Sequence, residues 1–200
     1  MKMSKVLVVA VHPDDETLGC AGTILKHKEQ GDEVYWMIIT SIRNHPNGYP
    51  SEVVKKREQT IKAVADAYGF NGMVELNIPT TLVDKSDLGT LVSKASKAID
   101  DIKPDVVYMM HEHDVHSDHR VSFSVIYSCL KSFRHPFVKR IYTFESLSET
   151  EFAVATPSNT FIPNVFVDIT DYIGKKLKIM SMYDTSLDRK SGSAGMPRPI

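Results

Sequence analysis

The chain has 200 residues, of which 42% are hydrophobic and 24% charged, and this length fits one ordinary domain with a single core. Its 24 basic and 25 acidic residues nearly cancel, and no basic stripe stands out, which argues against a nucleic-acid partner. The two cysteines, Cys20 and Cys129, are expected to be buried free thiols, a usage that fits a reducing cytoplasm.

The amino-terminal region differs from a targeting segment. A short apolar run begins at residue 6, but it ends in charged residues and no small-residue cleavage site follows. No apolar stretch approaches the length needed to span a bilayer. We therefore expect a cytoplasmic protein without a membrane span.

Apolar strands alternate with helices along the chain. The expected strands cover residues 6–11, 33–40, 74–76, 104–110, 140–145 and 165–169, and the expected helices cover 17–30, 51–68, 88–102, 118–132 and 171–183. Helices of this length between strands predict right-handed βαβ crossovers. The fold class is therefore α/β, a Rossmann-like three-layer α/β/α sandwich with a mostly parallel sheet. Residues from about 188 to 200 are expected to form a loop or tail.

The most informative motif is His12-Pro13-Asp14-Asp15-Glu16, which stands where the first expected strand ends and the first expected helix begins. It places one imidazole and three carboxylates in the crevice where open α/β sheets usually bind ligands. Burying so much negative charge is costly without a cation or hydrogen-bond donors to compensate it. The motif therefore indicates a site for a divalent metal.

A second polar cluster, with the sequence HEHDVHSDH, begins at His111 directly after another expected strand. His116 and His119 are three residues apart, so both can face one point at the start of a helix. Asp118 is suited to cap that helix or to orient a neighbouring imidazole. Asp114 is suited to support His116 or the loop.

Both clusters leave the carboxyl ends of strands, so the predicted fold would bring them together. His12, Asp15 and His119 could then supply two imidazoles and one carboxylate to a metal. Three protein ligands with an open position for water are typical of a catalytic rather than a structural zinc site. Asp14, beside these ligands, would be available to accept a proton from that water.

Each motif also has a simpler explanation. Acidic residues and threonine after a strand are good first-turn residues, which accounts for one or two of the carboxylates but not for His12. The histidine-dense cluster, taken alone, could be a solvated loop. Arg57 follows Lys55 and Lys56 and could belong to a solvated charged face.

The two motifs together resemble the PIG-L/LmbE-like family of metal-dependent N-deacetylases. Arg57, on a helix followed by Gly69, is similar to an arginine of that family, and residues 161–170 resemble the segment before its last helix. The match in order and spacing extends over nearly the whole chain. The resemblance implies a single LmbE-like deacetylase domain over residues 1–200.

By this resemblance, the protein is a hydrolase acting on a linear amide C–N bond. It would remove the acetyl group from an N-acetylated amino sugar or glycoconjugate of the N-acetylglucosamine type, releasing acetate and a free amine. Its partner would be a small-molecule substrate. Members of the family commonly assemble, so the resemblance also allows for a homo-oligomer. The implied ligands His12, Asp15 and His119 would bind Zn²⁺, or alternatively Fe²⁺ or another divalent metal.

The resemblance also implies roles for four further residues. Asp14 would be the general base, and a protonated His116 would stabilise the oxyanion. Asp118 would hold the His116 imidazole in place. Arg57 would contact the substrate.

The chain departs from the family pattern at three places. Thr40-Ser41-Ile42-Arg43 replaces a turn that often bears glycine, Thr60 replaces a glutamate, and Thr185-Ser186-Leu187 replaces a Ser-Gln pair. The loop after residue 40 often lines the substrate pocket in this family. These departures leave the identity of the substrate open, and none of them affects the expected metal ligands.

Two other functions stay open from the sequence. One is a metal-dependent amidase of a non-sugar or thiol conjugate, and the other is a non-catalytic Rossmann-like module that keeps a metal for structure. Asp14 argues against the second, because a structural metal site needs no additional base. Dinucleotide binding is disfavoured because the acidic motif replaces the glycine-rich turn and would repel phosphate.

Overall fold

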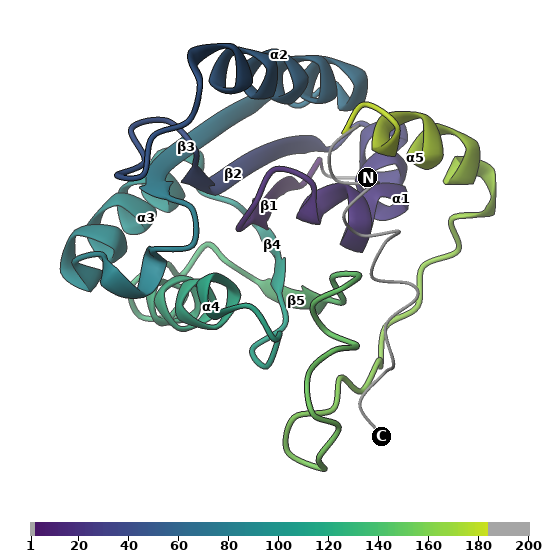
Figure 1. Cartoon of the computed structure of the whole chain (residues 1–200). Coiled ribbons are helices and arrows are strands. Elements are labelled where there is room, and N and C mark those ends of the chain that lie inside the picture. Colours follow the sequence, from purple (N-terminus) through teal and green to yellow (C-terminus); the bar gives the residue numbers. More distant parts are fainter. Residues whose placement is uncertain (1–2, 184–200) are drawn as a thin grey trace.

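The computed structural model describes residues 3–183, in which helices cover a five-stranded sheet (Figure 1). The strands are β1 (Lys5–Ala10), β2 (Glu33–Ser41), β3 (Gly72–Pro79), β4 (Val106–Met110) and β5 (Arg140–Phe144). The helices are α1 (Asp15–Glu29), α2 (Ser51–Tyr68), α3 (Leu88–Ile102), α4 (Ser117–Cys129) and α5 (Ile173–Met180), with short 3-10 turns at Val83–Lys85 and Thr170–Tyr172.

The strands are ordered β3-β2-β1-β4-β5, and every neighbouring pair is parallel. β1 pairs with β2 on one side and with β4 on the other, so the direction in which strands are added reverses at β1. This reversal leaves a crevice beyond the carboxyl ends of β1 and β4, the usual ligand position in open α/β sheets. The predicted Rossmann-like sheet is confirmed.

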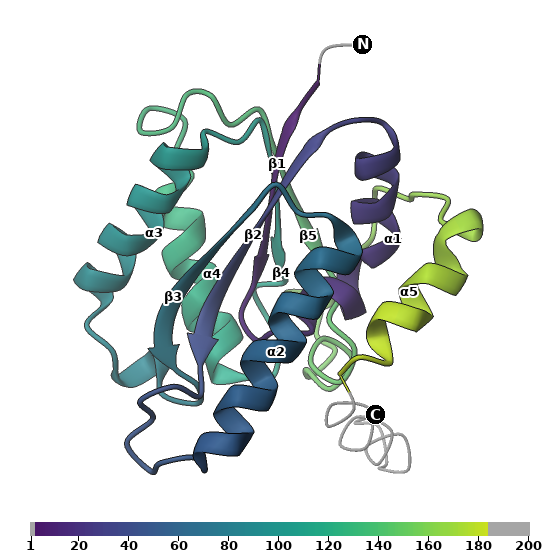
Figure 2. The same cartoon turned by 90° about the horizontal axis from the view of Figure 1, so that it is seen from above.

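The sheet separates two hydrophobic cores because successive side chains of a strand point to opposite faces. Leu7 and Val9 of β1 pack with α3 and α4, whereas Val6 and Val8 pack with α1, α2 and α5. Figure 2 shows α3 and α4 on one side of the sheet and α1, α2 and α5 on the other. The three-layer sandwich therefore forms as the sequence predicts.

Helix α1 packs closely against Phe144 of β5 and against Ile169. A Cβ atom added at Gly19 would lie 2.2 Å from the ring of Phe144, and one added at Gly22 would lie 2.4 Å from Ile169. Only glycine permits this approach at the two positions. The close packing fixes the amino-terminal end of α1, where the acidic motif lies.

One expected strand is absent from the described residues. Residues 165–169 form no regular secondary structure and pair with no strand of the sheet, and Phe166 is 81% exposed. Alternating apolar residues indicate strand propensity, but a strand also needs a hydrogen-bonding neighbour, and β5 remains the edge of the sheet. The last helix is also shorter than expected: residues 170–172 before α5 form a 3-10 turn, and residues 181–183 after it are not helical.

The expected tail at about 188–200 lies outside the described residues, as does the segment Thr185-Ser186-Leu187. Cys20 and Cys129 are buried free thiols, as predicted. Within residues 3–183, the helices lack the combination of length and apolar character needed to cross a bilayer.

Candidate metal centre and active site

The fold brings the two polar motifs together at the carboxyl ends of adjacent strands. β1 leads through His12 into α1, and β4 leads through His116 into α4. His12 Nδ1 lies 3.3 Å from His119 Nε2, although 107 positions separate the two residues in the chain. The parallel pairing of β1 and β4 explains this approach, because both connections leave the same edge of the sheet.

Three donor atoms from His12, Asp15 and His119 are grouped as a metal would require. Nε2 of His119 lies 3.3 Å from both His12 Nδ1 and Asp15 Oδ2. Zinc–nitrogen bonds of 2.0–2.1 Å in a tetrahedron place ligand atoms about 3.3 Å apart, so these two separations fit. The third separation, between His12 Nδ1 and Asp15 Oδ2, is 4.0 Å and requires only a small shift of the half-buried His12 ring.

Each of these candidate ligands is held by a second contact. Asp15 Oδ2 accepts backbone N–H bonds from Val11 at 3.0 Å and His12 at 2.8 Å. His119 Nδ1 lies 2.8 Å from Asp114 Oδ2, with both residues fully buried. A carboxylate on the far nitrogen of a ligating histidine fixes the ring and its tautomer.

The electrostatics of this group favour a positive charge. Burial alone would lower the pKa of His119, but the charge of Asp15 and the contact with Asp114 raise it to about 10. The acidic surroundings thus hold a proton on an imidazole that would otherwise be neutral. A divalent cation bound at this position would balance the same negative charge.

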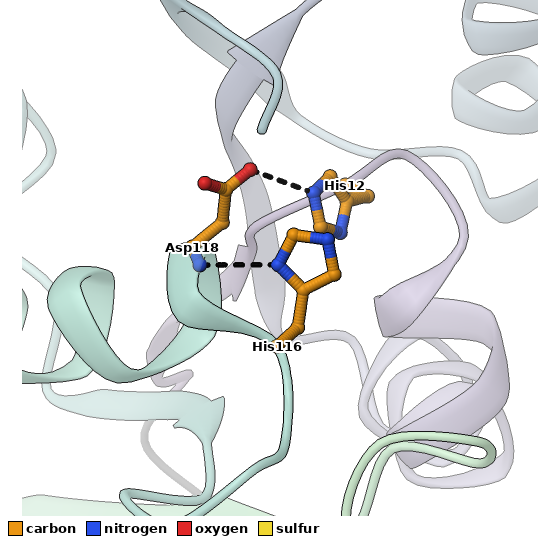
Figure 3. A group of neighbouring side chains, drawn as sticks. All are labelled: His12, His116 and Asp118. Carbon is orange, nitrogen blue, oxygen red and sulfur yellow. Dashed lines mark hydrogen bonds and ion pairs between the residues drawn. The ribbon is translucent and has the colours of Figure 1, made fainter. Parts of the chain in front are cut away.

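Asp118 contacts two imidazoles of the site, the expected His116 and also His12. Its Oδ2 lies 3.2 Å from His12 Nε2, and only its backbone N–H reaches His116, donating to Nδ1 at 3.1 Å (Figure 3). The carboxylate also accepts backbone bonds from Thr81 and Val83. Asp118 thus contacts His116 through its backbone N–H, while its carboxylate orients His12.

His116 caps helix α4 through its ring. Since Nδ1 accepts the N–H of Asp118, the ring proton must lie on Nε2, and protonating Nδ1 would break this cap. Burial and then the charge of His12 lower the pKa of His116, against the opposing charge of Asp118. This arrangement favours a neutral imidazole with its proton on Nε2, whereas the imidazolium expected from the sequence would lose the cap bond.

His12, His116 and Asp118 form a second group, in which one potential ligand atom of each residue lies within 4.8 Å of the others. In this group, however, Asp118 engages both oxygens with backbone N–H groups and with the far nitrogen of His12, a contact that leaves His12 Nδ1 facing His119. A metal there would have to displace these bonds. The group formed by His12, Asp15 and His119 is therefore the better candidate.

A cavity of about 570 Å³ opens beside this group and is lined by His12, Asp14, His116 and Arg57. Asp14 is almost wholly buried, and Arg57 donates from Nη1 to the carbonyl of Pro13 at 3.3 Å. The acidic motif and the arginine of α2 therefore meet at one wall of the cavity.

Another part of the cavity wall comes from the end of β2 and the loop after it, which contribute Ser41, Ile42, Arg43 and Tyr49. Arg43 donates to Glu58 of α2 through Nε at 2.9 Å and Nη2 at 2.6 Å. No sequence pattern singles out this pair, because its two members are 15 positions apart in a charged region. The loop supplies the part of the cavity in which the chain departs from the family pattern.

Glu16 belongs to a buried polar network behind the acidic motif. Its Oε1 accepts from Thr17 Oγ1 at 2.5 Å and from Tyr183 Oη at 2.9 Å, while Thr17 Oγ1 also contacts Tyr68 Oη at 2.9 Å. Burial is the main cause that raises the pKa of Glu16 from 4.5 to about 8. Glu16 supports the structure, while its two acidic neighbours face the site.

Replacing Glu16 by glutamine should make the stability of the metal-free protein less dependent on pH. Between pH 4.5 and about 8, the folded chain retains a proton on Glu16 that the unfolded chain releases. The stabilisation of the folded state by this protonated group is therefore fully present below pH 4.5 and is lost as the pH rises to about 8. For one proton the slope is at most about 1.4 kcal/mol per pH unit. Urea unfolding in EDTA at pH 5 to 8 measures it.

The matched control is Glu52→Gln, which removes an exposed carboxylate of α2. The slope of unfolding free energy against pH should flatten in Glu16→Gln and persist in the control. Identical slopes in wild type and Glu16→Gln would show that Glu16 is ionised in the folded protein throughout this range.

The fold and this site define a Rossmann-like α/β protein with a candidate divalent-metal centre at the switch point of its sheet. Residues 7–130 match the protein-family model described as PIG-L: GlcNAc-PI de-N-acetylase. This match covers more than half of the chain, and the chain belongs to the PIG-L family. The resemblance seen in the sequence motifs is thereby confirmed.

Two curated relatives are named as deacetylases. The chain is 22% identical over 196 residues to the probable N-acetyl-alpha-D-glucosaminyl L-malate deacetylase 2 of Bacillus anthracis, covering 92% of this chain and 82% of the relative. It is 24% identical over 196 residues to the diacetylchitobiose deacetylase of Thermococcus kodakarensis, covering 92% and 70%. The crystal structure of the conserved protein TT1542 from Thermus thermophilus shares the fold, with a TM-score of 0.76, 23% identity and coverage of 96% and 84%.

Proposed function

We propose that this protein is a metal-dependent N-deacetylase that hydrolyses the acetyl amide of an N-acetylated amino sugar or glycoconjugate. The observation that carries the proposal is the grouping of His12, Asp15 and His119 at the edge of a cavity that also contains Asp14 and His116. Membership of the PIG-L family and the names of the two relatives support the same reaction.

The candidate ligands suit zinc, and a His₂-carboxylate set also suits Fe²⁺. When bound, such a metal supplies Lewis acidity toward the acetyl carbonyl and lowers the pKa of water. Asp14 accepts the proton of the attacking water and later returns it to the nitrogen of the leaving amine. The buried position of Asp14 in the cavity wall supports this role.

His116 donates from Nε2 to the oxygen of the acetyl group as negative charge develops there. The cap bond from Asp118 fixes the ring, so this donor needs little rearrangement during the reaction. Asp118 also holds His12 by its far nitrogen. Arg57 and the loop after β2 would contact the part of the substrate beyond the acetyl group, because both line the cavity.

The proposal is tested by measuring acetate release from a panel of N-acetylated compounds. The panel contains N-acetylglucosamine, N,N'-diacetylchitobiose, an N-acetylglucosaminyl malate, and an N-acetylated thiol conjugate without a sugar. We expect equal amounts of acetate and free amine from at least one sugar substrate. Chelation should abolish the activity, and added Zn²⁺ or Fe²⁺ should restore it.

Other results would favour the alternatives. Acetate release from the thiol conjugate alone would indicate an amidase for non-sugar substrates. Stoichiometric metal binding with no acetate release from any compound would indicate a non-catalytic metal-binding module.

A further inference from the structure

Thr150 lies in the segment after β5 and reaches the metal centre through one intervening side chain. Its Oγ1 lies 2.6 Å from Asp114 Oδ1, and the other oxygen of Asp114 lies 2.8 Å from His119 Nδ1. Asp114 and His119 are fully buried, and Thr150 is 9% exposed. The three residues thus form a buried chain of contacts that ends on a candidate metal ligand.

The direction of these hydrogen bonds follows from the donors. Thr150 Oγ1 accepts the backbone N–H of Ser146 at 2.9 Å, so its single proton is directed to Asp114. Asp114 is then an acceptor at both oxygens, and His119 donates from Nδ1. Nε2, the second nitrogen of His119, then faces His12 and Asp15, where it would lose its proton on binding a metal.

The turn that carries Thr150 is itself well anchored. The backbone N–H of Thr150 donates to the carbonyl of Ser146 at 3.0 Å, which closes the turn together with the side-chain bond. The backbone N–H of Val115 donates to the carbonyl of Glu149 at 3.1 Å and ties the turn to the loop before α4. Thr150 is therefore held in place independently of its contact with Asp114.

We propose that Thr150 is a positioning residue for the metal centre, acting through Asp114 on the orientation and tautomer of His119. The inference rests on the proposed function, since it requires a metal at His12, Asp15 and His119. Without the hydroxyl group, the buried Asp114 Oδ1 loses its donor, and the carboxylate can rotate away from His119. Residues that orient metal-ligating histidines in this way affect metal affinity by about 10–100-fold.

The test measures the Zn²⁺ dissociation constant of the purified full chain by competition with a chromophoric chelator. Thr150→Val keeps the shape of the side chain and removes the hydroxyl group, and we expect it to weaken zinc binding by about 10-fold or more. Thr150→Ser retains the donor and should restore affinity close to that of wild type. Thr60→Val is the matched control, because that hydroxyl donates to the carbonyl of Lys56 in an exposed bond within α2.

Two further measurements separate positioning from a general structural effect. The visible spectrum of the Co²⁺-loaded protein should change in Thr150→Val and return in Thr150→Ser, because it reports the geometry of the ligands. In an Asp114→Asn background, Thr150→Val should have little additional effect, since both changes act through the same carboxylate.

The outcomes distinguish this inference from the proposed function. If wild type binds metal and Thr150→Val lowers the melting temperature without changing zinc affinity or the Co²⁺ spectrum, only the role of Thr150 is overturned. If wild type binds no stoichiometric Zn²⁺ or Co²⁺, both proposals fail. Equal weakening in Thr150→Ser and Thr150→Val would also overturn the positioning role, because serine keeps the donor.

Discussion

Asp14→Asn is expected to lower kcat for acetate release by about 10²–10⁴-fold while the bound metal stays at the wild-type level. Asparagine keeps the size and shape of the side chain, but its amide cannot accept a proton from water as a carboxylate can. Asp14 lines the cavity beside His12 and His116, so a base at this position can reach a water molecule next to the metal. Steady-state kinetics and elemental analysis of the same preparation provide the two measurements.

The control is Asp66→Asn, which removes an exposed carboxylate from α2 and should keep wild-type turnover. Two results would contradict the role of Asp14. Unchanged turnover would show that another group accepts the proton, and a parallel loss of metal would identify Asp14 as a ligand instead.

His116→Ala is expected to lower kcat by about 10²–10³-fold, equivalent to about 2.7–4 kcal/mol, with metal content retained. The physical reason is the loss of a fixed N–H donor at the oxygen that becomes negative. His116→Gln can place an amide N–H in the cavity and should recover part of the activity. His113→Ala, in the same loop, is the control for loss of an imidazole.

The pH profile tests which form of His116 acts. A neutral Nε2–H donor keeps its proton as pH rises, so turnover should not fall when an imidazolium would deprotonate. A decline in kcat near neutral pH in wild type that is absent in His116→Gln would instead support a protonated His116. Near-normal turnover of His116→Ala with full metal content would exclude the oxyanion role altogether.

The regular elements could be predicted from the sequence because their signals are local. Helix α2 begins after Pro50 and ends before Gly69, whose φ of 70° suits glycine at a helix end. The buried strand β1 is a continuous apolar run, as expected for the centre of a parallel sheet. The unpaired segment at 165–169 shows the limit of such signals, because strand pairing depends on neighbours that are distant in the chain.

The partners of individual polar groups could not be predicted in the same way. Asp118 is close to His116 in sequence, yet its carboxylate contacts His12 from a different strand connection. Asp114 supports His119 rather than His116, and Thr150 reaches it from 36 positions away. The spacing of residues at the start of a helix restricts which side chains can meet. The orientation of each carboxylate, however, depends on the buried hydrogen-bond donors around it.

The sequence by itself determined the α/β architecture, the two motifs and the edge of the sheet at which they meet, because periodicity and the direction of parallel strands specify these features. Only the tertiary structure decided which oxygen faces which imidazole, the backbone bond that Nδ1 of His116 accepts, and the cavity wall built by Arg43, Glu58 and the loop after β2. Hydrogen-bond directions and pKa shifts depend on burial and on atoms brought together by folding. These features lie in the spatial arrangement and have no local pattern in the chain.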